Sequence, residues 1–148
     1  MLIDTYVIDS NEDATEFDFV SIGPKGKIIK AVRYKKLASN RYMLGFGDYD
    51  EITDIIDDKA MSNNKDAVKV LSTVAKTLYE FFEKHPDAEV YVTGSTPKRT
   101  RVYNEIVHSR FPSLQNDFRI FGAVDDLFED WQPGIDYKFL KIYKRVKQ

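Results

Sequence analysis

The segment "VTGSTPKRTRVY" combines a glycine, hydroxyl groups and three cations in a pattern that could bind a ligand. Its pattern predicts a strand that ends near Val92, a tight turn and the start of a helix. Gly94 and Ser95 suit the turn, Thr96 suits the N-cap of the helix, and Pro97 suits the first helical position, where a missing N–H costs nothing. We therefore expect the backbone N–H groups of a helix start to lie directly after this strand.

Three cations follow in the first turn of this expected helix, namely Lys98, Arg99 and Arg101. The helix dipole and the unpaired N–H groups already make this end positive, so each cation costs about 0.3–1 kcal/mol unless an anion neutralises it. A phosphate or carboxylate would supply that charge. The predicted anion site is formed by Gly94, Ser95, Thr96, Lys98, Arg99 and Arg101.

Two alternatives to a bound anion stay open for these cations. One or both acidic segments, Asp48 to Asp58 and Asp125 to Asp130, could neutralise them within the protein, or the side chains could extend into solvent. ATP hydrolysis is disfavoured because "GSTPKRTR" lacks the glycine, lysine and hydroxyl spacing of a phosphate-binding loop. A hydrolase triad is disfavoured because the G-x-S-x-G frame is absent.

Other constellations are weaker. The segment from Asp48 to Asp58 has six carboxylates and no cation, and we interpret it as a solvated, helix-biased connection rather than a divalent-ion site because calcium-loop spacing is missing. The chain has no cysteine, which excludes disulfides and thiolate zinc sites. We interpret His85 as a cation at a helix end and His108 as a boundary residue. No interleaving of aromatic and basic residues of the RNA-binding kind is recognised.

Length and charge bound the class of protein. With 148 residues, the chain is expected to form a single domain over residues 1–148. A net charge of −2 argues against a protein that coats nucleic acid through bulk charge and leaves a local basic patch open. The sequence shows neither a signal-peptide pattern nor an apolar run of membrane-spanning length, so we expect a cytoplasmic protein without a membrane partner.

The first third of the chain predicts an antiparallel meander. Residues 16–37 alternate in polarity on both sides of "GPKG", Gly23 to Gly26, which predicts a β-hairpin. A short strand is expected around Tyr6 and Ile8, and another from Tyr42 to Phe46, ending at neighbouring glycines.

Helical spacing of apolar residues predicts a long helix from about Lys65 to Lys84, capped within Ser62 to Asn64. A strand over "AEVYVTGS", a second helix to about Phe111 and strands over "DFRIFGAV" and "YKFLKIYKRV" follow. The predicted fold class is α+β: one domain with a largely antiparallel, twisted sheet of about six strands and two main helices, in the order ββββ-α-β-α-β-β.

Three segments, "LGFGD" (Leu44 to Asp48), "SNNKDAVKVLSTVA" (Ser62 to Ala75) and "GSTPKRTRVYNEI" (Gly94 to Ile106), together resemble a family of uncharacterised bacterial proteins of about this length. That family has no assigned activity. The resemblance therefore implies a single bacterial domain and no particular chemistry.

The predicted element order is also similar to that of the acetyl-coenzyme A-dependent N-acetyltransferase superfamily. This resemblance implies acetyl-coenzyme A as cofactor and Tyr103, on the last helix, as general acid. The chain differs from that superfamily because "SNNKDAVK" has no glycine at the start of the long helix, where the cofactor pyrophosphate would bind.

Three functions follow as hypotheses. The first is an anion-binding domain that uses the turn from Gly94 to Arg101 for a phosphate-bearing small molecule or a nucleic-acid backbone. The second is a divergent N-acyltransferase with Tyr103 as acid. The third is a non-enzymatic interaction module, such as the partner of a toxin or phage component, whose acidic segments bind a basic protein surface.

Overall fold

The computed structural model describes residues 4–57, 64–93, 112–132, 134–135 and 137–145. By their contacts, these residues fall into two units, each described by itself below. The N-terminal unit comprises residues 2–35 and 45–84, and the C-terminal unit comprises residues 36–44 and 85–148. The expected single domain over residues 1–148 stays a prediction.

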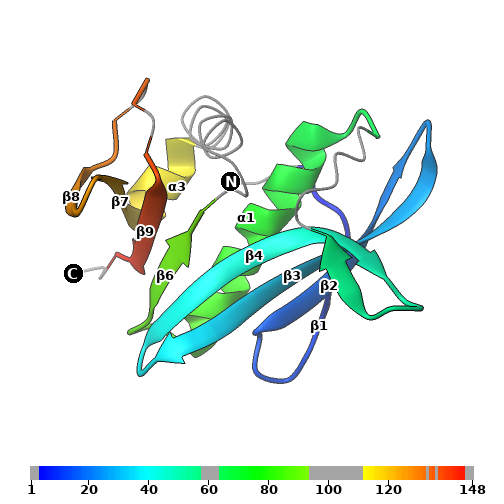
Figure 1. The fold of residues 1–148 in the computed structure, drawn as a ribbon, viewed down its shortest axis with the longest axis horizontal. Coiled ribbons are helices and arrows are strands. Elements are labelled where there is room, and N and C mark those ends of the chain that lie inside the picture. Colours follow the sequence, from blue (N-terminus) through cyan, green and yellow to red (C-terminus); the bar gives the residue numbers. More distant parts are fainter. Residues whose placement is uncertain (1–3, 58–63, 94–111, 133, 136, 146–148) are drawn as a thin grey trace. The chain divides into compact units, whose positions relative to one another are not determined.

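The N-terminal unit consists of antiparallel strands and one long helix (Figure 1). Its elements are β1 (Asp9–Ser10), β2 (Glu16–Gly23), β3 (Gly26–Ala38), β4 (Arg41–Asp50), β5 (Ile55–Asp57) and α1 (Ala67–Lys84); β3 and β4 each continue into the C-terminal unit. β1 pairs with β2, β2 with β3, and β4 with β5, all antiparallel. The hairpin predicted over residues 16–37 is confirmed, since Gly23 pairs with Gly26 across the turn.

α1 packs its apolar stripe against the β2–β3 hairpin, as its 3.6-residue periodicity predicts. Phe81 is fully buried and stacks on Tyr34 of β3, with ring centroids 4.2 Å apart and ring planes within 7°. The Tyr34 hydroxyl lies 2.7 Å from Oγ1 of Thr77, so the polar end of this buried ring is also satisfied. The predicted helix is confirmed, with its start two residues later than expected.

Asn64 does not act as the expected helix cap. Its side chain accepts a 2.7 Å hydrogen bond from the backbone N–H of Lys25 and donates to Ser21 Oγ and to the Gly26 carbonyl. Gly23 leaves room for this contact, because a Cβ there would lie 2.0 Å from the Asn64 carbonyl oxygen. Asn64 therefore ties the start of α1 to the β2–β3 turn.

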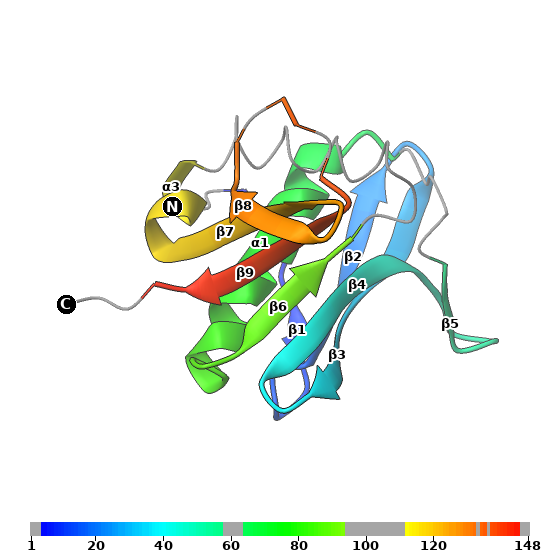
Figure 2. The ribbon, with the colours of Figure 1, turned by 60° about the vertical axis from the view of Figure 1, so that its left-hand side comes forward.

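The C-terminal unit is built on a mixed sheet (Figure 2). Besides the start of β4, it contains β6 (Glu89–Val92), α3 (Pro112–Asp117), β7 (Phe118–Val124), β8 (Leu127–Asp130) and β9 (Phe139–Lys144). The strand order is β4-β6-β9-β7-β8, with β4 and β6 parallel and the other pairs antiparallel. β9, the last of the described strands, thus lies between β6 and β7.

The predicted fold class is wrong in strand number, order and pairing. The described residues contain nine strands rather than about six, and two helices of 18 and 6 residues rather than two main helices. The parallel β4–β6 pair makes the pairing mixed. The order ββββ-α-β-α-β-β, and with it the N-acetyltransferase-like arrangement, is not observed, because β5 and β8 form hairpins in segments expected to be loops. The expected second helix, to about Phe111, lies outside the described residues.

The acidic segment is the clearest local correction. Up to residue 57 it forms the β4–β5 hairpin instead of a helix-biased connection, with Asp48 opposite Asp57. Asp48 also forms a salt bridge with the ammonium of Lys30, a residue of β3 that is only 6% exposed. Lys30 therefore neutralises one of the six carboxylates of the acidic segment. No described helix is both long enough and apolar enough to cross a membrane.

Candidate functional site

The predicted anion site lies outside the described residues. This holds for all six of its members and for the candidate acid Tyr103. The strand before it is described and agrees with the prediction, since β6 ends at Val92. The anion site and the role of Tyr103 therefore stay predictions, as does any contact between the basic turn and the acidic segments.

A different group of basic and aromatic side chains comes together on one face of the C-terminal sheet. Alternation along β9 sends Leu140 and Ile142 into the core and leaves Lys141 and Tyr143 on the opposite face. Neighbouring strands add further residues to that face. We name the following set the aromatic-basic face: Tyr91 of β6, Arg119 and Phe121 of β7, Phe128 of β8, and Lys141 and Tyr143 of β9.

Strand register brings these side chains together. Lys141 is paired with Tyr91 on one side and with Phe121 on the other, and Arg119 is paired with Tyr143. Directly paired residues on one face of a sheet have Cβ atoms about 5 Å apart. Chain positions more than 50 residues apart, such as Tyr91 and Tyr143, thus share one surface.

The ammonium of Lys141 lies among three aromatic rings. Its Nζ atom is 4.3 Å from the ring centroid of Phe128, 5.4 Å from that of Tyr143 and 5.5 Å from that of Phe121. The guanidinium of Arg119 lies 4.9 Å from the Phe121 centroid. Cation–π attraction of this kind contributes about 0.5–1 kcal/mol at exposed positions, so it orders the two cations without cancelling their charge.

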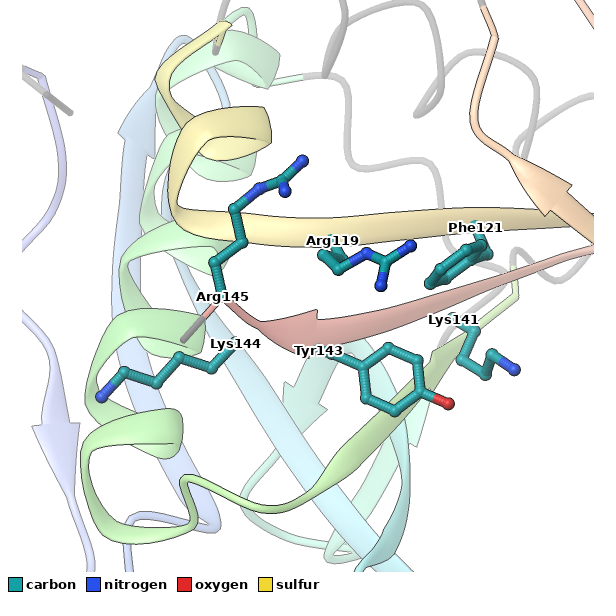
Figure 3. Close-up of a pocket in the computed structure, with 6 residues that line it drawn as sticks. All are labelled: Arg119, Phe121, Lys141, Tyr143, Lys144 and Arg145. Carbon is teal, nitrogen blue, oxygen red and sulfur yellow. The ribbon is translucent and has the colours of Figure 1, made fainter. Parts of the chain in front are cut away.

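Within the part of the chain that the structure describes, no direct ion pair neutralises the charge of these two cations. Arg33 and Arg41 form salt bridges with carboxylates, whereas Arg119 and Lys141 form none with any residue that the structure describes. They line an open pocket of about 570 Å³, whose lining includes no carboxylate among the described residues. Figure 3 shows the lining residues: Arg119, Phe121, Lys141, Tyr143, Lys144 and Arg145.

Glu89 of β6 fixes the tyrosines beside this pocket. Its Oε1 accepts a 2.8 Å hydrogen bond from the Tyr143 hydroxyl, and its Oε2 accepts one of 2.9 Å from the Tyr91 hydroxyl. Nε of Arg41 lies 3.3 Å from the same Oε2. The carboxylate is therefore held by two phenols and a guanidinium.

These contacts displace the pKa values of the groups involved. Burial alone would raise the pKa of Glu89, but the hydrogen bonds from Tyr143 and Tyr91, aided by the positive charges of Arg41 and Lys141, outweigh it and leave the pKa below its usual value. Burial, together with the hydrogen bond to Glu89 and its negative charge, raises the pKa of Tyr143 to about 12. At neutral pH, Glu89 is thus charged and Tyr143 is a neutral hydrogen-bond donor.

This arrangement of side chains suits the binding of a ligand better than acid–base catalysis. Arg119 and Lys141, which form no salt bridge within the described ranges, can attract an anion, and the partly exposed rings offer surfaces for planar groups. A tyrosine with a raised pKa is a poor general base at neutral pH. Among the described residues, no group of three or more His, Asp and Glu side chains could hold a metal ion.

Sequence reasoning missed this face although a local pattern was present. "RIF" at residues 119–121 and "KIY" at residues 141–143 each place a cation and an aromatic ring two positions apart, hence on one side of a strand. Each triplet alone is short and common. Their significance comes from the pairing of β7 with β9, which brings the two triplets side by side.

Comparison with known proteins places the chain in a family. Neither a curated protein nor a solved structure matches it, so the resemblance to N-acetyltransferases gains no support. One family model, described as a family of unknown function (DUF6934), matches residues 3–145. Because this match covers almost the whole length of 148 residues, the chain belongs to the DUF6934 family.

Proposed function

We propose that this protein binds a phosphate-bearing ligand at the aromatic-basic face. The observation that carries the proposal is the pocket lined by Arg119 and Lys141, which have no salt-bridge partner among the described residues. Arg145, two positions after Tyr143 in the chain, adds a further cation to its lining. A ligand with several negative oxygens would accept hydrogen bonds from more than one of these groups.

Two features make the face suitable for such a ligand. Cation–π contacts hold the Arg119 guanidinium near its position before binding, which lowers the entropy lost when an anion arrives. Glu89 of β6 accepts hydrogen bonds from Tyr91 and Tyr143 and forms a salt bridge with Arg41. Its charge also attracts Lys141, but over more than salt-bridge distance, so it competes with a ligand for this cation less strongly than a direct ion pair would.

The turn from Gly94 to Arg101 remains part of the proposal as a second source of cations. It follows β6 directly in the sequence, and β6 contributes Tyr91 to the face. Lys98, Arg99 and Arg101 would then bind the same ligand or a separate anion. The acyltransferase alternative is not favoured by any contact among the described residues.

The test is a thermal-shift titration with pyrophosphate, tripolyphosphate and nucleoside triphosphates. Wild type is compared with the double variant Arg119→Gln, Lys141→Gln, which removes both charges and keeps polar side chains of similar reach. A ligand at a hundred times its Kd stabilises by about 2.7 kcal/mol, several degrees for a domain of this size. We expect the shift to disappear in the double variant.

The matched control is Lys27→Gln, Lys35→Gln, which removes two exposed lysines of β3 in the N-terminal unit. It should retain the shift, because equal loss of net charge alone should matter little. A shift that persists in the Arg119, Lys141 variant and disappears in Arg99→Ala, Arg101→Ala would move the site to the predicted turn. No shift in wild type with any of the anions would refute the proposal.

A further inference from the structure

We infer that the ligand of the aromatic-basic face is single-stranded nucleic acid; this inference rests on the proposed binding of a phosphate-bearing ligand. The charges of the face account for phosphate. Cation–π contacts with the rings position the cations for phosphate, but a simple anion would leave the exposed flat surfaces of the rings unused. Bases of a single strand have exposed flat surfaces that stack on aromatic side chains, while their phosphates bind nearby cations.

The geometry of the rings leaves surfaces on which bases can stack. Phe121 meets Tyr143 at 87° with centroids 5.9 Å apart, and Tyr91 meets Phe128 at 61° with centroids 6.3 Å apart. In such edge-to-face pairs, the partner does not cover the flat surface of both rings. The core pair Tyr34 and Phe81, stacked within 7°, shows the opposite arrangement, in which each ring covers the other.

The rings are also accessible. Phe128 is 40% exposed, and Phe121 and Tyr143 are partly exposed. Exposing a phenylalanine has a hydrophobic cost that a ligand with an apolar surface would recover. Lys141 lies over these rings on a flexible stem, so its ammonium can turn from a ring towards a phosphate when a base takes its place.

The extent of the face favours a strand over a single nucleotide. Its residues come from β6, β9, β7 and β8, which are consecutive neighbours in the sheet. Adjacent strands lie about 4.8 Å apart, so four strands extend over roughly 14 Å. This is wider than one base, and the pocket is open rather than closed around a small molecule.

A duplex fits the face less well. Its bases are already paired and stacked, so only its phosphates would reach the protein and the rings would contribute nothing. With a net charge of −2, the protein has little bulk attraction for a polyanion. Affinity must therefore come from local contacts, and among these only stacking distinguishes a single strand from other polyanions.

The experiment measures fluorescence anisotropy of a labelled oligonucleotide of about 12 nucleotides, close to known site sizes for single strands. Single-stranded RNA and DNA of one sequence, the corresponding blunt duplex and unlabelled inorganic polyphosphate as competitor are compared. The variants are Phe121→Leu and Phe128→Leu, which stay apolar and lose the ring, and Phe128→Tyr, which keeps it. Circular dichroism confirms that each variant is folded.

We expect single strands to bind at least ten-fold more tightly than duplex. Each leucine variant should weaken this binding by about 5- to 150-fold, the range measured for loss of one stacking ring. Phe128→Tyr should bind single strands like wild type, and Phe121→Leu and Phe128→Leu should weaken single-strand binding by a larger factor than polyphosphate binding. The same titration compares the affinities for single-stranded RNA and single-stranded DNA.

The inference would be wrong, and the proposed function still possible, if duplex or polyphosphate bound as tightly as the single strand. The same conclusion would follow if the leucine variants bound the single strand like wild type. Absence of oligonucleotide binding with a retained thermal shift from the anions would overturn the inference alone, and absence of both would overturn the inference and the proposed function. The failure of the ligand class and the failure of the site are thus distinguished.

Discussion

The Tyr143 hydroxyl donates a 2.8 Å hydrogen bond to Oε1 of Glu89, joining β9 to β6 through side chains as well as backbone. The two residues flank the paired positions Val90 and Ile142, so they face each other directly across the two strands. Oε2 of the same carboxylate accepts from Tyr91. Glu89 therefore sets the position of two rings of the aromatic-basic face.

Replacing Glu89 with Gln should lower the pKa of Tyr143 from about 12 towards its ordinary value of 10.0. The amide removes the negative charge that opposes tyrosinate, while burial, the largest cause of the shift, still keeps the pKa above 10.0. Titration of isotope-labelled tyrosine by NMR measures this directly. An unchanged Tyr143 pKa would show that Glu89 does not control that hydroxyl.

The acid dependence of stability should show the contribution of Glu89. Its folded-state pKa lies below the usual 4.5, so the folded protein binds this proton more weakly than the unfolded chain does. Its stabilisation is therefore fully present above pH 4.5 and lost as the pH falls through the folded-state pKa.

The difference in unfolding free energy between wild type and Glu89→Gln should accordingly be largest near neutral pH and shrink below pH 4.5. Urea unfolding at several pH values measures it. Glu83→Gln, which removes one carboxylate at an exposed position of α1, is the matched control for the loss of a charge. A Glu89 difference that grows in acid would have the wrong sign and contradict the assignment.

Gly122 should tolerate no side chain, unlike Gly45. A Cβ on Gly122 would lie 2.2 Å from Cδ1 of Tyr137, a buried ring whose hydroxyl accepts a 3.1 Å hydrogen bond from the Gln132 N–H. Gly122→Ala should cost about 1–3 kcal/mol by overpacking. Gly45→Ala meets no described atom within 4 Å and should change stability by less than about 0.5 kcal/mol. Equal urea midpoints for the two variants would contradict this packing.

The elements predicted correctly are those whose pattern is local. Residues 16–37 alternate on both sides of a Gly-Pro-Lys-Gly turn, and α1 has an apolar stripe at helical spacing that ends in Phe81 and Phe82. In both, the residues that decide the structure lie within one turn or one hairpin of each other.

The strands β5 and β8, which the sequence analysis does not predict, lie in acidic segments. In these segments the Asp residues form turns, whereas the sequence analysis considers only their negative charge. Asp50 accepts a 2.9 Å hydrogen bond from the Ile52 N–H through its side chain, and Asp54 and Asp125 adopt positive φ angles of 55° and 59°. Asp accepts such local hydrogen bonds and adopts positive φ angles more readily than most residues. "DD" between Val124 and Leu127 was therefore a usable sign of a hairpin.

The aromatic-basic face could not be predicted in the same way. It depends on β9 lying between β6 and β7, an order set by long-range pairing and not by any local pattern. With β9 elsewhere, Lys141 would have neither Tyr91 nor Phe121 as its cross-strand partner. The sequence supplied the side chains, and only the topology shows that they share a surface.

Salt dependence should separate the two kinds of contact on this face. For single strands, the logarithm of the binding constant falls with the logarithm of the salt concentration by about 0.7 for each phosphate neutralised. Lys141→Gln should reduce that slope by about 0.7, because a cation is lost, whereas Phe128→Leu should weaken binding at every salt concentration and leave the slope unchanged. Anisotropy titrations between about 50 and 200 mM salt measure both slopes. If Lys141→Gln keeps the wild-type slope, its ammonium does not contact phosphate, and its place among the rings of Phe121, Phe128 and Tyr143 is then structural.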